Sequence, residues 1–146
     1  MGKRPIVVLD TNVIISALLW KGKAGSIFDL AKRNKIRIAT SKSIIDELVR
    51  VLKYPKLHNA IARQGLLNNQ IVEPFIDLVD IIEEEDFPIG IIEEDPTDDK
   101  VLSCAASTLA HYIVSGDQHL LKLKSFMYTE ILNPSDFLIA ITKHPK

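Results

Sequence analysis

The alternation of short strand-like runs with longer helical stretches constrains the fold of this chain most. Residues 6–9 form an unbroken apolar run, which is typical of a central parallel strand that is buried on both faces. Similar short runs follow at 36–39, 112–114 and 130–132. Strands separated by helices predict a doubly wound, three-layer α/β/α fold with a central parallel sheet. A length of 146 residues suits one such domain, over residues 1–146.

Helices are expected where apolar residues recur at helical spacing between these runs. Ser41 or Ser43 can cap the helix after the second strand, and Asn133 can cap the last helix, with Pro134 at its first position. The expected helices cover residues 13–20, 25–34, 43–53, 56–67, 69–82, 98–110, 118–123 and 134–142, and a short edge strand is expected at 89–92.

The composition excludes several classes of protein. No apolar run approaches the ~20 residues that a membrane-spanning helix needs, and the N-terminal residues lack the pattern of a cleavable signal. Cys104 is the only cysteine, which excludes disulfides within the chain and metal sites built from several thiolates. We therefore expect a soluble cytoplasmic protein that does not bind to membranes.

A net charge of −1 conceals a strong asymmetry along the chain. Residues 1–63 contain 13 Lys or Arg against 4 Asp or Glu, whereas residues 64–146 contain 5 against 15. A basic half can bind a phosphate backbone and an acidic half can bind metal or a basic partner, although both also fit solvated helix faces. We expect four basic residues of the first half to border the site: Lys21, Lys23, Arg50 and Lys53.

Two aspartates stand just beyond predicted strands. Asp10 directly follows the first strand, and Asp117 follows the strand at 112–114 with two residues between them. In a parallel sheet, ligands bind beyond the carboxyl ends of the strands, so both side chains are candidate site residues. Each aspartate also precedes a helix, and the alternative role for each is that of an N-terminal cap.

Helix geometry selects two further acids. Glu47 lies at the edge of the apolar face of its helix, whereas Asp46 points to the opposite side. Asp98 is in line with the apolar stripe of its helix, whereas Asp99 is rotated by about 100° toward the flank. We therefore expect Glu47 and Asp98 at the site, and not their neighbours. Asp98 also precedes a helix, and its alternative role is that of a cap.

Carboxylates brought together in this way require bound protons or a cation. Two carboxylates ~4 Å apart repel by about 4 kcal/mol at an effective dielectric of 20, and several such pairs would exceed the net stability of a small domain. Oxygen ligands favour Mg²⁺ or Mn²⁺ over zinc. One or two such ions could activate water and stabilise the charge that develops on a phosphodiester.

Four motifs, in this order, resemble those of PIN domains, and the resemblance covers nearly the whole chain. The first motif follows an apolar strand, as in that family, and residues 134–138 look like the helix that closes the domain. The motifs lie at residues 10–13, 43–48, 95–102 and 114–121, and the acids at the positions of the family's ligands are Asp10, Glu47, Asp98 and Asp117.

The resemblance implies a Rossmann-like fold and a Mg²⁺- or Mn²⁺-dependent endoribonuclease, here acting on the phosphodiester bonds of single-stranded RNA. It also implies a frequent role as the toxin of a toxin–antitoxin pair, with an antitoxin protein as partner, and it allows a homodimer. Three residues near the first acid are expected to support the site: Thr11, Asn12 and Ser16. Their alternatives are turn chemistry and a plain helix-surface hydroxyl.

For three other residues, a role in packing or at the surface is weighed against a role at the site. Trp20 is expected in the core, although it could stack on a base. His119 is expected to pack or to lie at the surface and not to act as a base. Lys100 either contacts phosphate or solvates its helix.

Other functions remain open on the sequence. A phosphohydrolase with Asp10 as nucleophile usually has a second aspartate two residues later, where this chain has Asn12. A response-regulator-like receiver needs a phosphoacceptor aspartate at the end of a third strand, and the chain lacks one. A non-catalytic RNA-binding or RNA-processing module would keep the fold and bind RNA without cutting it, with or without Mg²⁺.

Overall fold

The computed structural model describes residues 4–83 and 96–143, without the side chains of residues 96–98. Its strands form one sheet in the order β3-β2-β1-β4-β6-β5. Every pairing is parallel except that of β5 with β6. The strands are β1 (Ile6–Leu9), β2 (Arg37–Ser41), β3 (Asp80–Ile82), β4 (Tyr112–Val114), β5 (Ser125–Phe126) and β6 (Thr129–Leu132).

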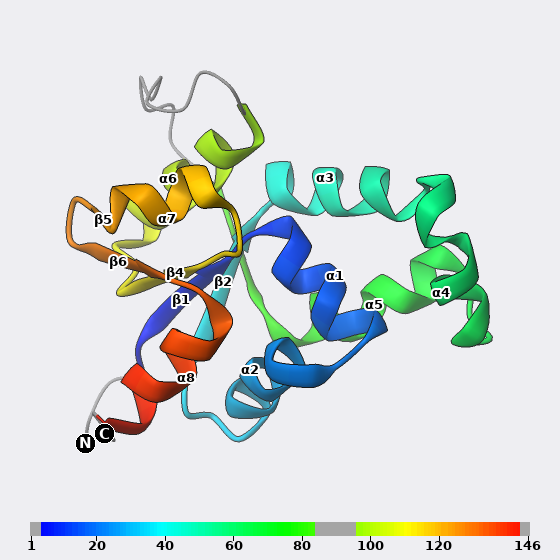
Figure 1. The fold of residues 1–146 in the computed structure, drawn as a ribbon, viewed down its shortest axis with the longest axis horizontal. Coiled ribbons are helices and arrows are strands. Elements are labelled where there is room, and N and C mark those ends of the chain that lie inside the picture. The colour runs from blue at the N-terminus through cyan, green and yellow to red at the C-terminus, as the bar shows by residue number, and fades with distance from the viewer. Residues whose placement is uncertain (1–3, 84–95, 144–146) are drawn as a thin grey trace.

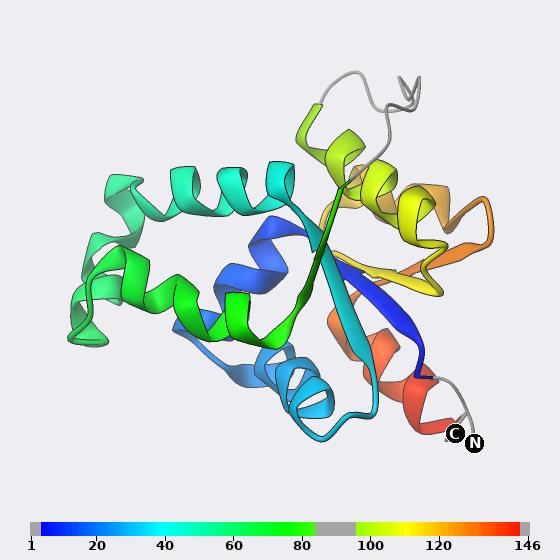
Figure 2. The ribbon, with the colours of Figure 1, turned by 180° about the vertical axis from the view of Figure 1, so that it is seen from behind.

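Helices cover both faces of this sheet. Figures 1 and 2 show α1, α2 and α8 on one side and α6 on the other, where it packs against β1 and β2. This arrangement confirms the predicted three-layer α/β/α fold. The helices are α1 (Thr11–Leu19), α2 (Gly22–Lys32), α3 (Lys42–Leu52), α4 (His58–Arg63), α5 (Asn68–Leu78), α6 (Pro96–Thr108), α7 (Gln118–Leu123) and α8 (Pro134–Lys143), with a 3₁₀ turn η1 (Pro55–Leu57).

The central strand β1 is buried on both faces, as its apolar run predicts. Val7, Val8 and Leu9 are almost completely inaccessible to solvent. They can all be apolar because helices lie over both faces, which leaves no side of the strand in water. The predicted caps of two helices are also confirmed. The Ile44 N–H donates to Ser41 Oγ (3.3 Å) before α3, and the Asp136 N–H donates to Asn133 Oδ1 (2.7 Å) at α8.

The structure differs from the sequence prediction mainly between α3 and α6. The helix expected at 69–82 ends at Leu78, and Asp80–Ile82 instead forms β3, which pairs in parallel with β2. The free edge of β2 supplies hydrogen-bond partners for this segment, and the spacing of apolar residues cannot reveal such a partner. The helix expected at 56–67 is split into η1 and α4. The expected strand at 89–92 lies outside the described residues, and β5 has no counterpart in the prediction.

Among the described residues, none of the helices is long and apolar enough to cross a membrane. The organisation of residues 1–146 as a single domain stays a prediction.

Candidate functional site

Asp10 is the first residue after β1 and the N-terminal cap of α1. Its backbone N–H donates to Val114 O of β4 (3.1 Å), and its Oδ1 accepts from the Val13 N–H (2.9 Å). The residue is only 6% exposed. The cap accounts for one carboxylate oxygen, whereas the other is bonded to the segment that follows β4.

Ser115 connects Asp10 to Asp117. The buried Ser115 hydroxyl donates to Asp10 Oδ2 and accepts from the Asp117 N–H (2.9 Å). Asp117 in turn caps α7, since its Oδ1 accepts from the N–H groups of His119 (2.7 Å) and Leu120 (3.4 Å). One hydroxyl thus holds two of the predicted acids beside each other at the carboxyl edge of β1 and β4.

The environment of Asp10 disfavours its charged form. Burial raises the pKa of the Asp10 carboxyl from 3.8 to about 6, and repulsion from Asp117 adds to this, while the hydrogen bonds from Ser115 and Val13 oppose it. Among the described residues, no basic side chain lies within ion-pair distance of Asp10, and Asp117 has only His119, with Nδ1 3.6 Å from Oδ1. A bound cation would relieve this excess of negative charge.

Glu47 has a different electrostatic environment. It is 7% exposed, as its position at the edge of the apolar face of α3 predicts. Its Oε1 forms an ion pair with Arg50 of the same helix, and Lys100 Nζ of α6 lies 3.8 Å away. Arg50 also donates to the Tyr54 hydroxyl (2.8 Å). Two cations therefore already compensate the charge of Glu47, and Arg50 is engaged by its own helix.

The first turn of α6 carries both Asp98 and Asp99. The side chain of Asp98 lies outside the described residues, so its place at the site stays a prediction. Asp99 is partly buried, and its Oδ1 is shielded from solvent with no hydrogen-bond partner in the described part of the chain. A buried acceptor without a partner costs about 1–3 kcal/mol unless a donor or a cation satisfies it. Asp99 is therefore a candidate that the helical stripe alone does not select.

The chemistry of these donors suits a hard cation. Asp10 and Asp117 offer carboxylate oxygens, and the buried Asp99 Oδ1 still needs a partner, which is the donor type that Mg²⁺ and Mn²⁺ prefer. Across the described residues, however, no three His, Cys, Asp or Glu side chains form a group that could hold a metal ion. The paired arrangement of Asp10 and Asp117 is established, and the four-residue metal site stays a prediction.

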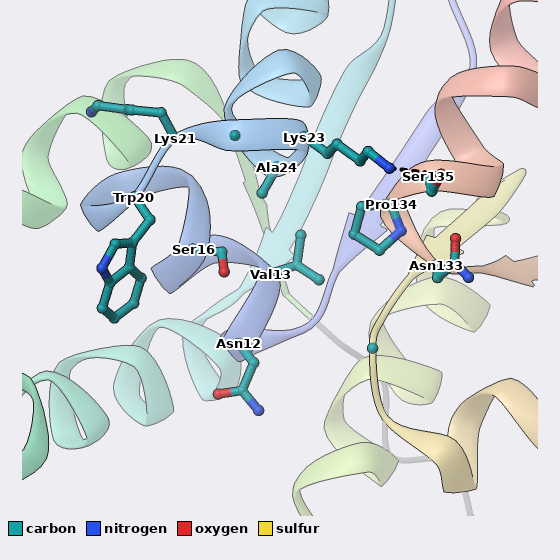
Figure 3. A pocket seen from close by; sticks show the side chains of 12 residues that line it. Asn12, Val13, Ser16, Trp20, Lys21, Lys23, Ala24, Asn133, Pro134 and Ser135 are labelled. Atoms are coloured by element: carbon teal, nitrogen blue, oxygen red, sulfur yellow. Dashed lines mark hydrogen bonds between the residues drawn. The ribbon is translucent and has the colours of Figure 1, made fainter.

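A cavity of about 480 Å³ lies along α1, and neither of the two aspartates is among its lining residues. Its lining includes Asn12, two residues after Asp10, and Gly116, directly before Asp117. Ser16, one helical turn beyond Asn12, lines the same cavity (Figure 3). The other predicted supporting residue, Thr11, is the first residue of α1 and is instead buried, and its Oγ1 has no hydrogen-bond partner among the described residues.

Two residues of the cavity region have roles that local sequence patterns do not reveal. Trp20, expected in the core, is 55% exposed. It is the C-terminal cap of α1 and lies beyond Leu19, the last buried residue of that helix. Ser115 is fully buried and bridges the two aspartates. The one signal for Ser115 is its position, since a hydroxyl residue directly after a strand lies at the edge of the sheet where ligands bind.

Comparison with known proteins agrees with this fold. A family model described as a PIN domain matches residues 6–119. Curated proteins gave no sequence match. Among solved structures, VapBC2 from Rickettsia felis, bound to a DNA fragment from its promoter, is 19% identical, with a TM-score of 0.61 over 88% of this chain and 98% of that chain.

Two further solved structures share the fold. FitAcB from Neisseria gonorrhoeae is 17% identical, with a TM-score of 0.50 over 88% of this chain and 98% of that chain. The PIN domain of RRP44 from T. brucei is 14% identical, with a TM-score of 0.50 over 96% of this chain and 82% of that chain. At these low identities the solved structures show only that the fold is shared. The match to the family model covers most of the chain and shows the family. This chain therefore belongs to the PIN-domain family.

Proposed function

We propose that this chain is a metal-dependent endoribonuclease that hydrolyses phosphodiester bonds of single-stranded RNA. The observation that supports this most is the buried Asp10 carboxylate, joined through Ser115 to Asp117, with no Lys or Arg within ion-pair distance of either acid in the described part of the chain. A protein tolerates such a pair when a bound cation removes the repulsion. Membership of a family whose members are typically nucleases supports the same reaction.

The proposed ligands come from three parts of the fold. Asp10 and Asp117 follow β1 and β4, Asp98 and Asp99 begin α6, and Glu47 lies on α3. A bound Mg²⁺ or Mn²⁺ would stabilise the negative charge that develops on the phosphodiester and would make a water molecule more acidic. Ser115 keeps the carboxylate of Asp10 oriented, and the surrounding apolar core keeps it from bulk water.

We propose that Glu47 binds the metal ion more weakly than the other members of this set. Because Arg50 and Lys100 already neutralise it, a metal ion must compete with two cations for its oxygens. Its pair with Lys100 also connects α3 to the first turn of α6, which carries the two aspartates. Loss of Glu47 should therefore weaken metal binding less than loss of Asp10 does.

The test is cleavage of a panel of labelled single-stranded RNAs with Mn²⁺, with Mg²⁺ and with EDTA. We expect cleavage with metal only, and a loss of more than about 100-fold in Asp10→Asn, since even residues that merely orient metal ligands are worth about 10–100-fold. Asp46→Asn is the control because it makes the same substitution at an exposed acid, which is paired with Lys42 on α3. RNA that is bound but never cut by the wild-type chain would instead favour the non-catalytic binding module.

We further propose that the chain acts in the cytoplasm as the toxin of a toxin–antitoxin pair. Two of the similar structures, VapBC2 and FitAcB, are of toxin–antitoxin proteins. Expression of the wild-type chain in a bacterial host should arrest growth, whereas the Asp10→Asn chain should not. Growth arrest that persists in Asp10→Asn would separate toxicity from the carboxylate site and contradict this role.

A further inference from the structure

We propose that the cavity beside Asn12 is a subsite for the single-stranded polynucleotide, in which Trp20 stacks against a base and Lys23 binds a backbone phosphate. The inference rests on the proposed function in so far as the strand is taken to be the substrate. It adds a surface outside the carboxylate site and assigns a role to each of two residues on that surface.

The cavity is built on the one accessible stripe of α1. Asn12 and Ser16 are the residues of this helix that are not buried, and Trp20 continues their line at the C-terminal cap. Spacings of four residues place all three on one side of the helix. With a rise of 1.5 Å per residue, the stripe from Asn12 to Trp20 is about 12 Å long, which exceeds the ~3.4 Å between stacked nucleotides. The stripe therefore has room for more than one nucleotide.

Trp20 is available for stacking. Its side chain stands at the end of the stripe, on the rim of the cavity, and is more than half exposed (Figure 3). Base stacking on an exposed aromatic surface is favourable for every base. The position of Trp20 thus fits a ligand with a planar ring and little sequence preference.

Lys23 supplies a positive charge on the opposite side. Its Nζ reaches from the first turn of α2 to Ser135 Oγ at the start of α8, 3.1 Å away (Figure 3). Among the described residues, no carboxylate lies within ion-pair distance of this ammonium group. The lining of the cavity contains lysines and no acidic residue. The lysines favour an anionic group at the edge of the cavity, and the rest of the lining is largely apolar. The Nζ of Lys21 itself donates to Leu18 O (3.3 Å).

One end of the cavity is formed by residues next to the proposed ligands in the chain. Asn12 and Gly116, which line one end, are each within two residues of the proposed ligands Asp10 and Asp117. Trp20 and Lys21 lie toward the other end of α1, whereas the ammonium group of Lys23 lies beside Ser135 (Figure 3). A strand that passes the carboxylates can therefore continue along the stripe, so that stacking and phosphate contacts position the bond to be cut without reading bases.

The direct test uses the fluorescence of Trp20, which is the only tryptophan of the chain. The wild-type protein is titrated in EDTA with a single-stranded RNA oligonucleotide and with an abasic strand of the same length. Stacking should quench the fluorescence with the RNA and leave it unchanged with the abasic strand, which keeps the phosphates and lacks the bases. Quenching of equal size by both strands, or by neither while the RNA binds, would overturn the proposal.

Binding of a labelled RNA, followed by anisotropy in EDTA, tests the two residues separately. Trp20→Leu should weaken the Kd by roughly 5- to 100-fold, and Trp20→Phe should recover much of it. Tyr128→Leu is the matched control because Tyr128 is another exposed aromatic side chain, far from this cavity, in the β5–β6 turn. An equal effect of Trp20→Leu and Tyr128→Leu would contradict the stacking role.

Lys23→Gln should lower the slope of log K against log salt by about 0.7, the value for one phosphate contact on a single strand. Lys32→Gln, at the other end of α2, is the control and should leave the slope unchanged. An unchanged slope in Lys23→Gln would remove the lysine from the binding surface.

The binding measurements are made in EDTA, so they do not depend on cleavage. RNA that stacks on Trp20 in EDTA but is never cut in a separate assay with Mn²⁺ would disprove the nuclease and keep the subsite. RNA that is cut normally by Trp20→Leu, with unchanged binding, would disprove the subsite and keep the nuclease.

Discussion

At the scale of single residues, Asp10 has two roles that conflict. As the cap of α1 it needs an acceptor oxygen, which aspartate and asparagine supply equally well. As a buried carboxylate beside Asp117 it has an unfavourable charge, and this is why its pKa is raised to about 6. Capping alone therefore does not explain why this position holds an ionisable aspartate and not an asparagine.

The Asp10→Asn variant should be more stable than the wild type without metal at high pH. The folded chain binds the Asp10 proton more tightly than the unfolded chain, whose carboxyl has its ordinary pKa near 3.8. The contribution of Asp10 to the free energy of unfolding is therefore greatest below pH 4, falls as the pH rises through about 6 and stays lower above it. A shift of about two units corresponds to roughly 3 kcal/mol. We expect Asp10→Asn to gain about 2–3 kcal/mol at pH 8 in EDTA and nothing at pH 4, by urea denaturation.

Asp46→Asn, in an exposed acid, should show no such pH-dependent gain. A lower free energy of unfolding in Asp10→Asn at pH 8 would mean that the cap or the hydrogen bond from Ser115 needs the charge, and would contradict the electrostatic interpretation.

Asp98 and Asp99 should both be needed for cleavage. The apolar stripe of α6 selects Asp98, and the buried Oδ1 of Asp99, which has no hydrogen-bond partner among the described residues, selects Asp99. We expect Asp98→Asn and Asp99→Asn each to lower the initial rate of RNA cleavage at saturating Mn²⁺ by at least about 100-fold. A wild-type rate of cleavage in Asp99→Asn would exclude Asp99 from the metal site. A wild-type rate in Asp98→Asn would show that the apolar stripe of α6 does not identify the ligand.

At the scale of elements, the turn between β4 and α7 determines the geometry of the site. The Ser115 hydroxyl satisfies Asp10 Oδ2 and the Asp117 N–H together, so that β1, β4 and α7 are tied at one point. Its bond also lowers the pKa of Asp10 against the effect of burial. The same hydroxyl therefore contributes to the stability of the turn and to the charge of the carboxylate.

Ser115→Ala should cost about 1–3 kcal/mol in urea denaturation, because the variant leaves one buried acceptor and one backbone donor without their partner. It should also move the pH midpoint of Mn²⁺ binding upward, since the pKa of Asp10 rises further when this hydrogen bond is lost. Ser115→Thr keeps the hydroxyl and should restore the pH midpoint even if its methyl group disturbs packing. An unchanged midpoint in Ser115→Ala would mean that Ser115 has only a structural role.

At the scale of the whole molecule, a stable α/β/α fold carries an electrostatically unfavourable edge. The core around β1 is apolar and buried, while Asp10 and Asp117 lie beyond the carboxyl ends of β1 and β4. Lys23, from the basic first half of the sequence, lies near this edge, since its Nζ is 3.1 Å from Ser135 Oγ, just after β6. We propose that an anionic strand binds there and a metal ion at the aspartates.

Mn²⁺ should stabilise the whole molecule by binding only to the folded site. At a concentration 100 times the Kd the gain is about 2.7 kcal/mol, which for a domain of this size raises the Tm by about 5–10 °C. The Tm is measured with Mn²⁺ and with EDTA, and Asp117→Asn, which can still cap α7, should show a smaller rise. A wild-type Tm that is the same in both conditions would contradict the metal site.

Features that depend on neighbours in the chain could be predicted from the sequence. The apolar run of β1, the caps Ser41 and Asn133, and the positions of Asp10 and Asp117 beyond their strands follow from local spacing, and the structure confirms them. The inward edge position of Glu47 on α3 follows from helical periodicity in the same way. These features were predictable because backbone geometry fixes the period of a helix and the direction in which a strand ends.

Only the tertiary structure decided which groups became partners. Asp10 and Ser115 are 105 positions apart, and Lys100 reaches Glu47 from another helix, so no local pattern contains either contact. The pairing of β3 with β2 turned a segment with helical spacing into a strand, because an open sheet edge offers hydrogen bonds that the isolated segment lacks. The exposure of Trp20 likewise depended on what packs around the end of α1, since periodicity gives the face of a helix and not what covers it.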